Sequence, residues 1–441
     1  MRIFGRIVGV LAACMVLLVL VVVVRGPALS TLQASAAAFS AEEVSRGEYL
    51  ARAGNCAACH TAHGGQDFAG GLKMATPLGV IEATNITPDP ETGIGAYSLQ
   101  DFDLAMRQGV APGRRYLYPA MPYPSYARIS DADIRSLYAY FMTAVAPVKR
   151  ANAPTSIPWP LNMRWPLAVW NTLFAPSEPY HDSPDASAAW NRGAYLVQGL
   201  GHCGACHTPR GIAQQERAYD EQGRLFLTGG QLDHWSAPDL GGNPRWGLGR
   251  WSEADIARFL KTGRNRFSSS FGTMTEVINS STQYLSDADL TAIGVYLKAL
   301  RPAAEATGTS TRLTAACAPI SDSGATEYWR YCSSCHGAKG EGQGAHIAPL
   351  AGNPAIQDPD PSSVINITLN GSMPIVIGGL PDRYKMPPFR NVMDDRELAA
   401  LLNYMRCSWG NEASLVRHDQ IAKIRSATEY VRDQAQLLQM Q

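Results

Sequence analysis

The stretch Cys203-Gly204-Ala205-Cys206-His207 decides the interpretation of this chain of 441 residues, because the chain contains the same pattern three times. The other two copies are Cys56-Ala57-Ala58-Cys59-His60 and Cys332-Ser333-Ser334-Cys335-His336. Cys-x-x-Cys-His is the attachment sequence of c-type haem, in which two thiols form thioethers to the porphyrin and the adjacent imidazole binds the iron. With nine Cys and nine His in the chain, chance would produce about 0.004 copies. We therefore predict three covalently bound haem c groups.

Two other uses of a Cys-x-x-Cys pair fit less well. A structural zinc site is usually completed by a second close pair of ligands, and none of the three copies is accompanied by one. A thioredoxin-like redox pair needs a βαβ context, whereas each copy lies between a helix-like segment and a Gly/Pro-rich segment. Covalent haem remains the favoured interpretation.

Composition limits the classes of partner. The 38 basic residues balance the 38 acidic ones, and only 17% of residues are charged, so no basic surface for nucleic acid is expected. The apolar fraction of 46% is that of a globular protein. The length favours about three domains, in agreement with the number of motifs.

Residues 1–37 have the layout of an export signal or an N-terminal membrane anchor. Arg2 and Arg6 precede an apolar run from Ile7 to Val24, and the small-residue stretch 34–37 follows. The run is longer than a usual signal core and would just span a bilayer, so both cleavage and retention remain open, with cleavage favoured. Cys14 lies inside the run, which argues against lipidation. The arginines stay inside, and the haem motifs are expected on the far side of the membrane.

Beyond the haem motifs, a longer unit recurs. Each copy begins with a helical segment before the cysteines (46–50, 192–196 and 324–328). Each copy ends with a helix that has apolar residues at helical spacing (133–141, 289–297 and 397–405). We expect these closing helices to be capped by Asp131, Asp287 and Asp394. A Pro/Gly-rich loop and a short helical stretch lie between the two helices in every copy.

This plan resembles a class I cytochrome c domain. The expected fold is mainly α, with three tandem domains at 38–150, 183–302 and 323–411 joined by Pro/Gly-rich loops. Residues 151–182 form a Pro/Trp-rich linker that either packs on the haem domains or offers a docking surface to a partner subunit or the membrane. Residues 303–322 are expected to be an exposed linker. The tail 412–441 is predicted to be an amphipathic helix used for core packing or partner contact.

One methionine in each copy is a candidate for the second axial ligand of the iron. Between His207 and residue 302 the chain contains a single methionine, Met274, 13 residues before Asp287. The corresponding frame selects Met121 and Met386, both next to prolines that fix the backbone. Met74, Met106 and Met373 fit the frame less well. Ligation by His60, His207 and His336 together with these methionines would leave no open coordination position, which favours outer-sphere electron transfer.

Cys317 precedes the third domain and Cys407 ends its closing helix. In cytochrome c folds the first and last helices cross, so the resemblance implies a Cys317–Cys407 disulfide. Two free thiols remain the alternative. Such a bridge would contribute about 4 to 5 kcal/mol on the loop-entropy model.

Several segments together resemble the triheme cytochrome c subunit of membrane-bound alcohol, gluconate and sugar dehydrogenases. The resemblance covers residues 40–411 and rests on these segments: 55–61, 85–89, 118–123, 203–210 and 408–411. It implies a separate large PQQ- or flavin-dependent dehydrogenase subunit as electron donor and ubiquinone as acceptor. It also implies a location at the periplasmic face of the bacterial cytoplasmic membrane.

No catalytic residue is predicted, because the chain contains no Rossmann fingerprint, P-loop or nucleophile elbow. Two alternatives to an electron-transfer subunit remain. One is a multihaem enzyme such as a peroxidase, which would need an exchangeable axial ligand. The other is a free-standing periplasmic shuttle that serves a terminal oxidase or reductase.

Overall fold

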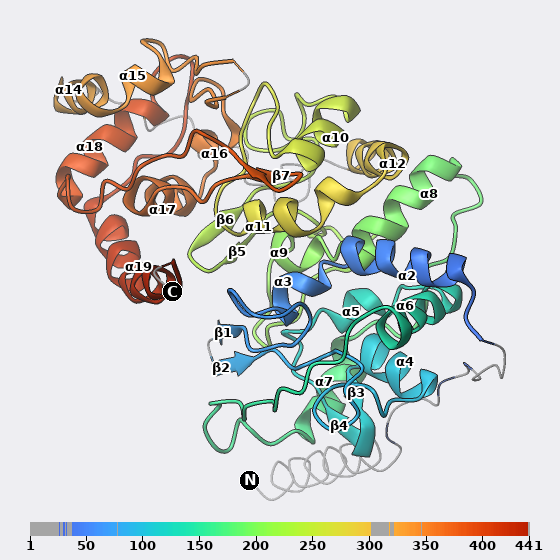
Figure 1. Cartoon of the computed structure of the whole chain (residues 1–441). Coiled ribbons are helices and arrows are strands. Elements are labelled where there is room, and N and C mark those ends of the chain that lie inside the picture. The colour runs from blue at the N-terminus through green and yellow to red at the C-terminus, as the bar shows by residue number, and fades with distance from the viewer. Residues whose placement is uncertain are drawn as a thin grey trace, which may run out of the picture. The chain divides into compact units, whose positions relative to one another are not determined.

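A computed structural model describes residues 26, 30, 32, 38–76, 78–300, 317, 322–344 and 346–439, with backbone alone from 429 onward (Figure 1). The predicted apolar run 7–24 and nearly all of linker 303–322 lie outside these residues. The chain divides into two compact units: one holds residues up to 51, 59–181 and 212–215, and the other holds 52–58, 182–211 and 216–441. Within the described ranges, no helix is long and apolar enough to cross a bilayer.

The first unit contains the first repeat and the segment that follows it. Its helices and strands are α2 (Ala41–Ala53), α3 (Cys56–His60), β1 (Lys73–Thr76), β2 (Gly79–Glu82), α4 (Leu99–Gln108), β3 (Val110–Ala111), η1 (Pro112–Arg114), β4 (Arg115–Tyr116), α5 (Tyr123–Tyr126), α6 (Asp131–Thr143) and α7 (Pro166–Phe174). The end of α2 and the start of α3 are grouped with the second unit. The strands form two antiparallel two-stranded hairpins, β1–β2 and β3–β4.

The second unit contains the second and third repeats. The second repeat comprises α8 (Ala188–Tyr195), the π-helical turn η2 (Leu196–Leu200), α9 (Gly204–His207), β5 (Gly230–Leu232), β6 (Trp235–Ala237), α10 (Glu253–Thr262), α11 (Thr273–Ser280), η3 (Thr282–Tyr284) and α12 (Asp287–Lys298). The third comprises α14 (Asp322–Tyr331), α15 (Ser333–His336), α16 (Pro354–Gln357), α17 (Ser362–Asn370), β7 (Val376–Ile377), β8 (Leu380–Pro381) and α18 (Asp395–Arg406). The terminal helix α19 (His418–Gln439) follows.

In every repeat the first helix packs on the closing helix, and a glycine makes the close approach possible. Figure 1 shows α14 beside α18, and the same pairing joins α8 to α12. A Cβ on these glycines would lie 2.0 to 2.2 Å from a backbone carbonyl oxygen, which no side chain tolerates. The pairs are Gly47 against Ser136, Gly193 against Ala292, and Gly324 against Ala400.

Ion pairs reinforce this crossing in two repeats. Arg46 lies 2.6 Å from Asp133, and Arg192 lies 2.7 Å from Asp289. Each arginine precedes the crossing glycine, and each aspartate lies in the first turn of the closing helix. The two repeats therefore share a specific contact as well as an element order.

The caps of the closing helices differ partly from the prediction. Asp394 caps α18, and its side chain accepts from the backbone N–H of Arg396 and of Glu397. The prediction for the other two was wrong by one residue, because Ser130 and Ser286 are the caps while Asp131 and Asp287 are the first helical residues. A serine hydroxyl accepts the free N–H of the first turn equally well, and an aspartate just inside the helix favours the positive end of its dipole.

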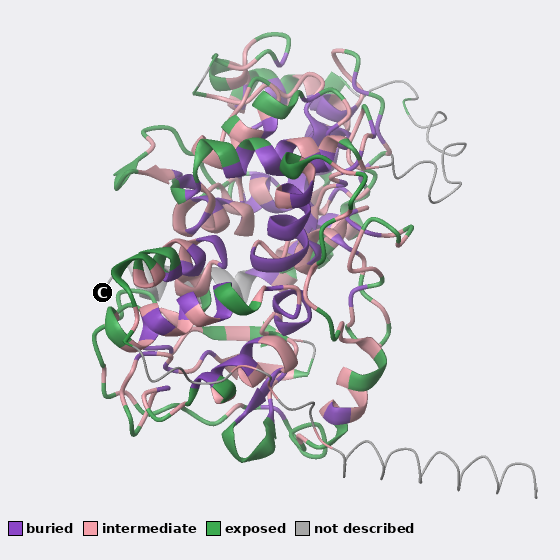
Figure 2. Ribbon diagram, turned by 90° about the vertical axis from the view of Figure 1, so that its right-hand side faces the viewer, coloured by how far each residue is buried: buried purple, intermediate pink, exposed green. Residues whose placement is uncertain are grey.

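Buried residues line the inner faces of the packed helices, as the purple positions in Figure 2 show. In the third repeat the core includes Tyr328, Leu401 and Ile365, and α19 adds the buried Ile421 and Ile424. The described part of the predicted amphipathic tail therefore packs on the third repeat.

The second and third repeats are also joined by hydrogen bonds within the second unit. The amide side chain of Asn279 accepts from the N–H of Val376 (2.8 Å) and donates to the carbonyl of Pro374 (3.1 Å). Gln283 makes the same kind of pair with Val376 and Gly378, at 2.9 Å each. The two side-chain amides thus pair with the backbone of residues 374–378 as a neighbouring strand would. They attach the β7–β8 hairpin to α11 and η3.

The Pro/Trp-rich segment 151–182 is packed at some positions and exposed at others. In α7, Ala168 is buried, and the Trp170 indole donates to the carbonyl of Ala213 (2.8 Å). By contrast, Trp159 is 78% exposed and Leu173 is 63% exposed. One part of the segment is therefore packed, as expected of a linker that covers a haem domain. Another part exposes large apolar side chains, as expected of a docking surface.

Candidate haem-binding sites

The three haem motifs form one short helix each, which places the second cysteine and the histidine on adjacent positions of the same turn. These helices are α3, α9 and α15. None of their six cysteines is in a disulfide. Burial raises the pKa of the Cys203 and Cys332 thiols to about 12. This disfavours the thiolate that a zinc site or a redox dithiol would need.

Each motif histidine is held in the same way by a backbone carbonyl. The Nδ1 atom of His60 lies 2.7 Å from the oxygen of Thr84, that of His207 lies 2.8 Å from Pro238, and that of His336 lies 3.2 Å from Ala348. A carbonyl oxygen can only accept, so Nδ1 must carry the proton. The lone pair is therefore on Nε2, the nitrogen left for the iron.

The electrostatics of the three imidazoles agree with this arrangement. Desolvation lowers the pKa of His60, His207 and His336, and the carbonyl contact opposes the shift in each case. The neutral imidazole is the form that ligates metals.

The candidate methionines of the first two repeats share a backbone frame. In the first repeat the N–H of Leu117 donates to the carbonyl of Gly109, the left-handed cap of α4 (2.7 Å). In the second, the N–H of Ser270 donates to Gly263, the left-handed cap of α10 (2.8 Å). Met121 and Met274 each follow the bonded residue by four positions. The two segments differ in sequence, but each has a methionine at the same number of residues after the hydrogen bond to the cap of the middle helix.

The third repeat holds its methionine by a related pairing. The N–H of Met386 donates to the hydroxyl of Ser372 (2.9 Å), and the N–H of Ser372 donates to the carbonyl of Met386 (3.0 Å). Ser372 follows Gly371, the cap of α17. The loop is again attached just after the middle helix, although the register differs.

The competing methionines lie elsewhere. Met106 is buried within α4, Met393 and Met405 belong to the third core, and Met74 is in β1. Met373 is 48% exposed. The half-buried Met121, Met274 and Met386 remain the candidates that the frame selects.

The second repeat also carries a buried donor that fits a bound carboxylate. The indole of Trp251 is 6% exposed, and its Nε1–H has no acceptor among the described residues. Its ring stacks on Phe267, which lies between α10 and the Met274 helix (5.8 Å between centroids). An unpaired buried N–H costs about 1 to 3 kcal/mol. A haem propionate would supply the missing acceptor, so the donor set here fits the cofactor.

A buried carboxyl lies against the second motif. A Cβ on Gly204 would lie 2.3 Å from an oxygen of Glu216, which is 6% exposed. Burial raises the pKa of Glu216 to about 7, against the opposing effect of Arg210. No sequence pattern singles out Glu216, because it lies next to the motif only in the folded chain.

Cys317 and Cys407 form a disulfide, with sulfurs 2.04 Å apart. The disulfide joins Cys317 in the second linker to Cys407, the residue that directly follows α18.

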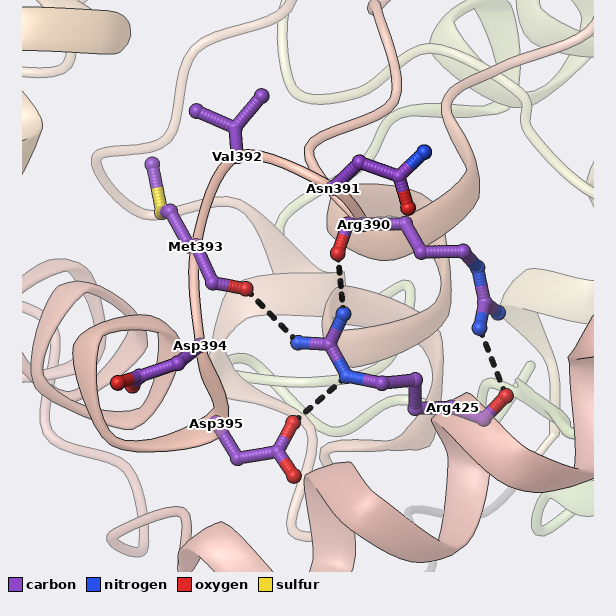
Figure 3. A pocket seen from close by; sticks show the side chains of 7 residues that line it. All are labelled: Arg390, Asn391, Val392, Met393, Asp394, Asp395 and Arg425. Atoms are coloured by element: carbon purple, nitrogen blue, oxygen red, sulfur yellow. Dashed lines mark hydrogen bonds and ion pairs between the residues drawn. The ribbon is translucent and has the colours of Figure 1, made fainter.

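A hollow of about 390 Å³ on the third repeat has a structural explanation (Figure 3). Arg425 of α19 donates to the carboxylate of Asp395 (2.7 Å) and to the carbonyls of Met393 (3.0 Å) and Arg390. Arg390 donates back to the carbonyl of Arg425 (2.7 Å). The two guanidinium groups fasten α19 to the segment after the Met386 loop.

Two family models match this chain. The model described as "Cytochrome c" matches residues 44–144, and the model described as "Cytochrome C oxidase, cbb3-type, subunit III" matches residues 320–405.

Full-length relatives extend the match. The chain is 48% identical to the gluconate 2-dehydrogenase cytochrome c subunit of Pantoea cypripedii, over 87% of this chain and 89% of the relative. It is 45% identical to the cytochrome c subunit of the quinone alcohol dehydrogenase of Gluconobacter oxydans strain 621H, over 87% and 82%. It is 36% identical to the fructose dehydrogenase cytochrome subunit of Gluconobacter japonicus, over 88% and 84%. With its haem-attachment helices and these relatives, the chain belongs to the family of cytochrome c subunits of gluconate, alcohol and fructose dehydrogenases.

Proposed function

We propose that this chain is a triheme electron-transfer subunit built from three tandem class I cytochrome c domains, at residues 38–150, 183–302 and 323–411. One observation, made in all three repeats, carries the proposal. The histidine of each Cys-x-x-Cys-His motif has its Nδ1 hydrogen-bonded to a backbone carbonyl. A single motif could arise for other reasons, but the same contact in three repeats calls for the same ligand three times.

The proposed haem-binding residues follow from the motifs and the methionine frame. The thioether cysteines are Cys56 and Cys59, Cys203 and Cys206, and Cys332 and Cys335. The axial pairs are His60 with Met121, His207 with Met274, and His336 with Met386. Bound haem supplies one-electron chemistry, and a methionine ligand raises its potential. Because both axial positions would be filled by the protein, no substrate would bind at the iron, and the electrons would leave each haem by outer-sphere transfer.

The electron donor would be a large dehydrogenase subunit that carries PQQ or a flavin, and the acceptor would be ubiquinone. The names of the relatives support the donor, since each is the cytochrome subunit of a dehydrogenase. We place the protein at the periplasmic face of the bacterial cytoplasmic membrane. The apolar run 7–24 behind Arg2 and Arg6 supports this, as do the exposed side chains of Trp159 and Leu173.

The haem count tests the core of the proposal. Haemochrome spectroscopy and intact mass of the purified chain should give three covalent haems, and Cys203→Ala with Cys206→Ala should leave two. Fewer than three in the unaltered protein would contradict the triheme assignment.

Two further measurements separate the alternatives. Rapid binding of cyanide or carbon monoxide to the native protein would reveal an exchangeable ligand and favour a multihaem enzyme. Purification of the chain in complex with a dehydrogenase subunit would exclude a free-standing shuttle.

A further inference from the structure

We propose that His202 is a positioning residue that ties the turn carrying Cys56 to the turn carrying Cys203, and so fixes the separation of the first two haems. This inference rests on the proposed function, which makes both motifs haem sites. The contacts that support it lie within the second unit, because residues 52–58, at the end of α2 and the start of the first motif, belong to that unit.

Two contacts bind the end of α2 to the segment around η3 in the second repeat. The guanidinium of Arg52 lies over the ring of Tyr284, 4.7 Å from its centroid. The hydroxyl of Ser281 donates to the carbonyl of Ala53 (3.3 Å), and both of these residues are buried. The chain directly before the first motif is therefore held by side chains of the second repeat.

The imidazole of His202 makes a third contact, with the backbone of Gly54. Burial lowers the pKa of the partly buried His202, and the bond to Gly54 opposes this shift. A backbone contact that favours the protonated ring must be accepted by a carbonyl oxygen, so the imidazole N–H is the donor. Gly54 lies two residues before Cys56, and His202 lies directly before Cys203. One hydrogen bond thus connects the chain beside the two attachment cysteines.

The backbone of the second repeat has an additional residue in the segment that carries His202. Ten positions separate the crossing glycine from the first cysteine of the motif in the second repeat, against nine in the first and eight in the third. The π-helical turn η2 takes up this extra length, since the N–H of Gly201 donates to the carbonyl of Leu196, five residues earlier (2.7 Å). Such turns are rare and are frequent at functional sites.

His202 also has a backbone conformation that favours glycine. Its φ is +36°, in the left-handed region, where a Cβ is unfavourable. Asn55, the residue before Cys56, has a φ of +52°, but asparagine is one of the residue types that adopt this region most readily. A histidine at position 202, in place of the glycine that the backbone favours, indicates that its side chain has a role.

The hydrogen bond bears on electron exchange because each thioether attaches one edge of a porphyrin to its cysteine. The rate of electron transfer falls steeply with distance, so a fixed separation of the two attachment turns gives a fixed rate. In this exchange one electron leaves a ferrous iron and reduces a ferric iron. No bond forms or breaks, and His202 keeps its proton and is neither oxidised nor reduced.

Circular dichroism in the Soret region tests the contact without turnover. Two haems that are held close together at a fixed angle couple their absorption and give a pair of bands of opposite sign. The oxidised full-length holoprotein should show such a pair. The double variant Cys56→Ala with Cys59→Ala removes the first haem, and the part of the signal that it abolishes belongs to that haem.

His202→Gly is the decisive variant, because glycine adopts the observed φ without a Cβ, and the chain should fold with three haems. The part of the signal that depends on the first haem should be lost. Amides of residues 52–58 should exchange with deuterium about fivefold faster, as expected for one lost hydrogen bond. His202→Asn and His202→Gln each keep a side-chain N–H donor, and at least one of them should restore the signal. His63→Gly removes an exposed histidine three residues after His60, and this control should change neither measurement.

The haem count separates failure of this inference from failure of the proposed function. Fewer than three covalent haems in the unaltered protein would overturn the proposed function. Three haems without a signal that depends on the first haem would overturn the role of His202 alone, as would unchanged signal and exchange in His202→Gly. A His202→Gly protein with fewer than three haems, or a loss of signal that neither Asn nor Gln restores, would also contradict that role.

Discussion

Replacing Gly47 by alanine tests the helix crossing that defines each repeat. Gly47 is buried in α2, where a Cβ would lie 2.0 Å from the carbonyl oxygen of Ser136 and 2.6 Å from the Cβ of Tyr140. Both neighbours belong to the rigid frame of α6, so neither can rotate away. The two helices would have to separate by more than about 1 Å to restore ordinary contact.

Two opposing effects set the magnitude. Alanine is favoured over glycine inside a helix by about 1 kcal/mol. Forcing a methyl group into a close-packed crossing costs about 3 kcal/mol, at the upper end of overpacking effects, because the obstacle is backbone. The expected net loss is about 2 kcal/mol of local stability, whereas helix propensity alone would predict a gain of about 1 kcal/mol. A loss of local stability in Gly47→Ala would therefore indicate overpacking at the helix crossing, and a gain would indicate helix propensity alone.

Hydrogen–deuterium exchange of the holoprotein is the suitable assay, because unfolding of a multidomain chain is not two-state. Amides of α2 and α6 should exchange about 30-fold faster in Gly47→Ala, which corresponds to 2 kcal/mol. Glu48→Ala, an exposed neighbour in the same helix, is the control and should stay close to the unaltered protein. Slower or unchanged exchange in Gly47→Ala would refute the crossing argument.

Three further predictions concern the sites. Met274→Ala should abolish the sulfur-to-iron charge-transfer absorption of one haem in three and lower its potential; an unchanged spectrum would remove Met274 as a ligand. Because the pKa of Glu216 is raised to about 7 in the folded protein, its contribution to stability is fully present below the unfolded value near 4.5 and is lost as pH rises through 7. Glu216→Gln should therefore remove a pH-dependent loss of about 3 kcal/mol from the opening free energy of the second repeat. Hydrogen–deuterium exchange of its amides at pH 5 and pH 8 measures this loss, and the same pH dependence in both proteins would count against it. Reduction of the Cys317–Cys407 disulfide should lower the opening free energy of the third repeat by about 4 kcal/mol, and equal hydrogen–deuterium exchange of its amides before and after reduction would contradict this.

Much of the architecture followed from local patterns in the sequence. The haem motifs and the closing helices depend on short-range spacing, and α6, α12 and α18 lie where apolar periodicity placed them. The caps at Ser130 and Ser286 were missed because serine and aspartate are adjacent there and both are good N-caps.

Features that depend on tertiary contact could not be predicted in the same way. The acceptors for the three imidazoles are backbone carbonyls of Thr84, Pro238 and Ala348, and every residue has a carbonyl. Glu216 acquires its surroundings only after distant segments meet.

The sulfur bridge also changes what a single cut in the backbone would do to this molecule. Any one nick between residues 318 and 406 would leave both fragments joined through Cys317 and Cys407, and the motif at 332–336 would stay tethered on either side of the break. A single proteolytic cut in the third repeat would thus leave its haem-attachment motif joined to the rest of the protein.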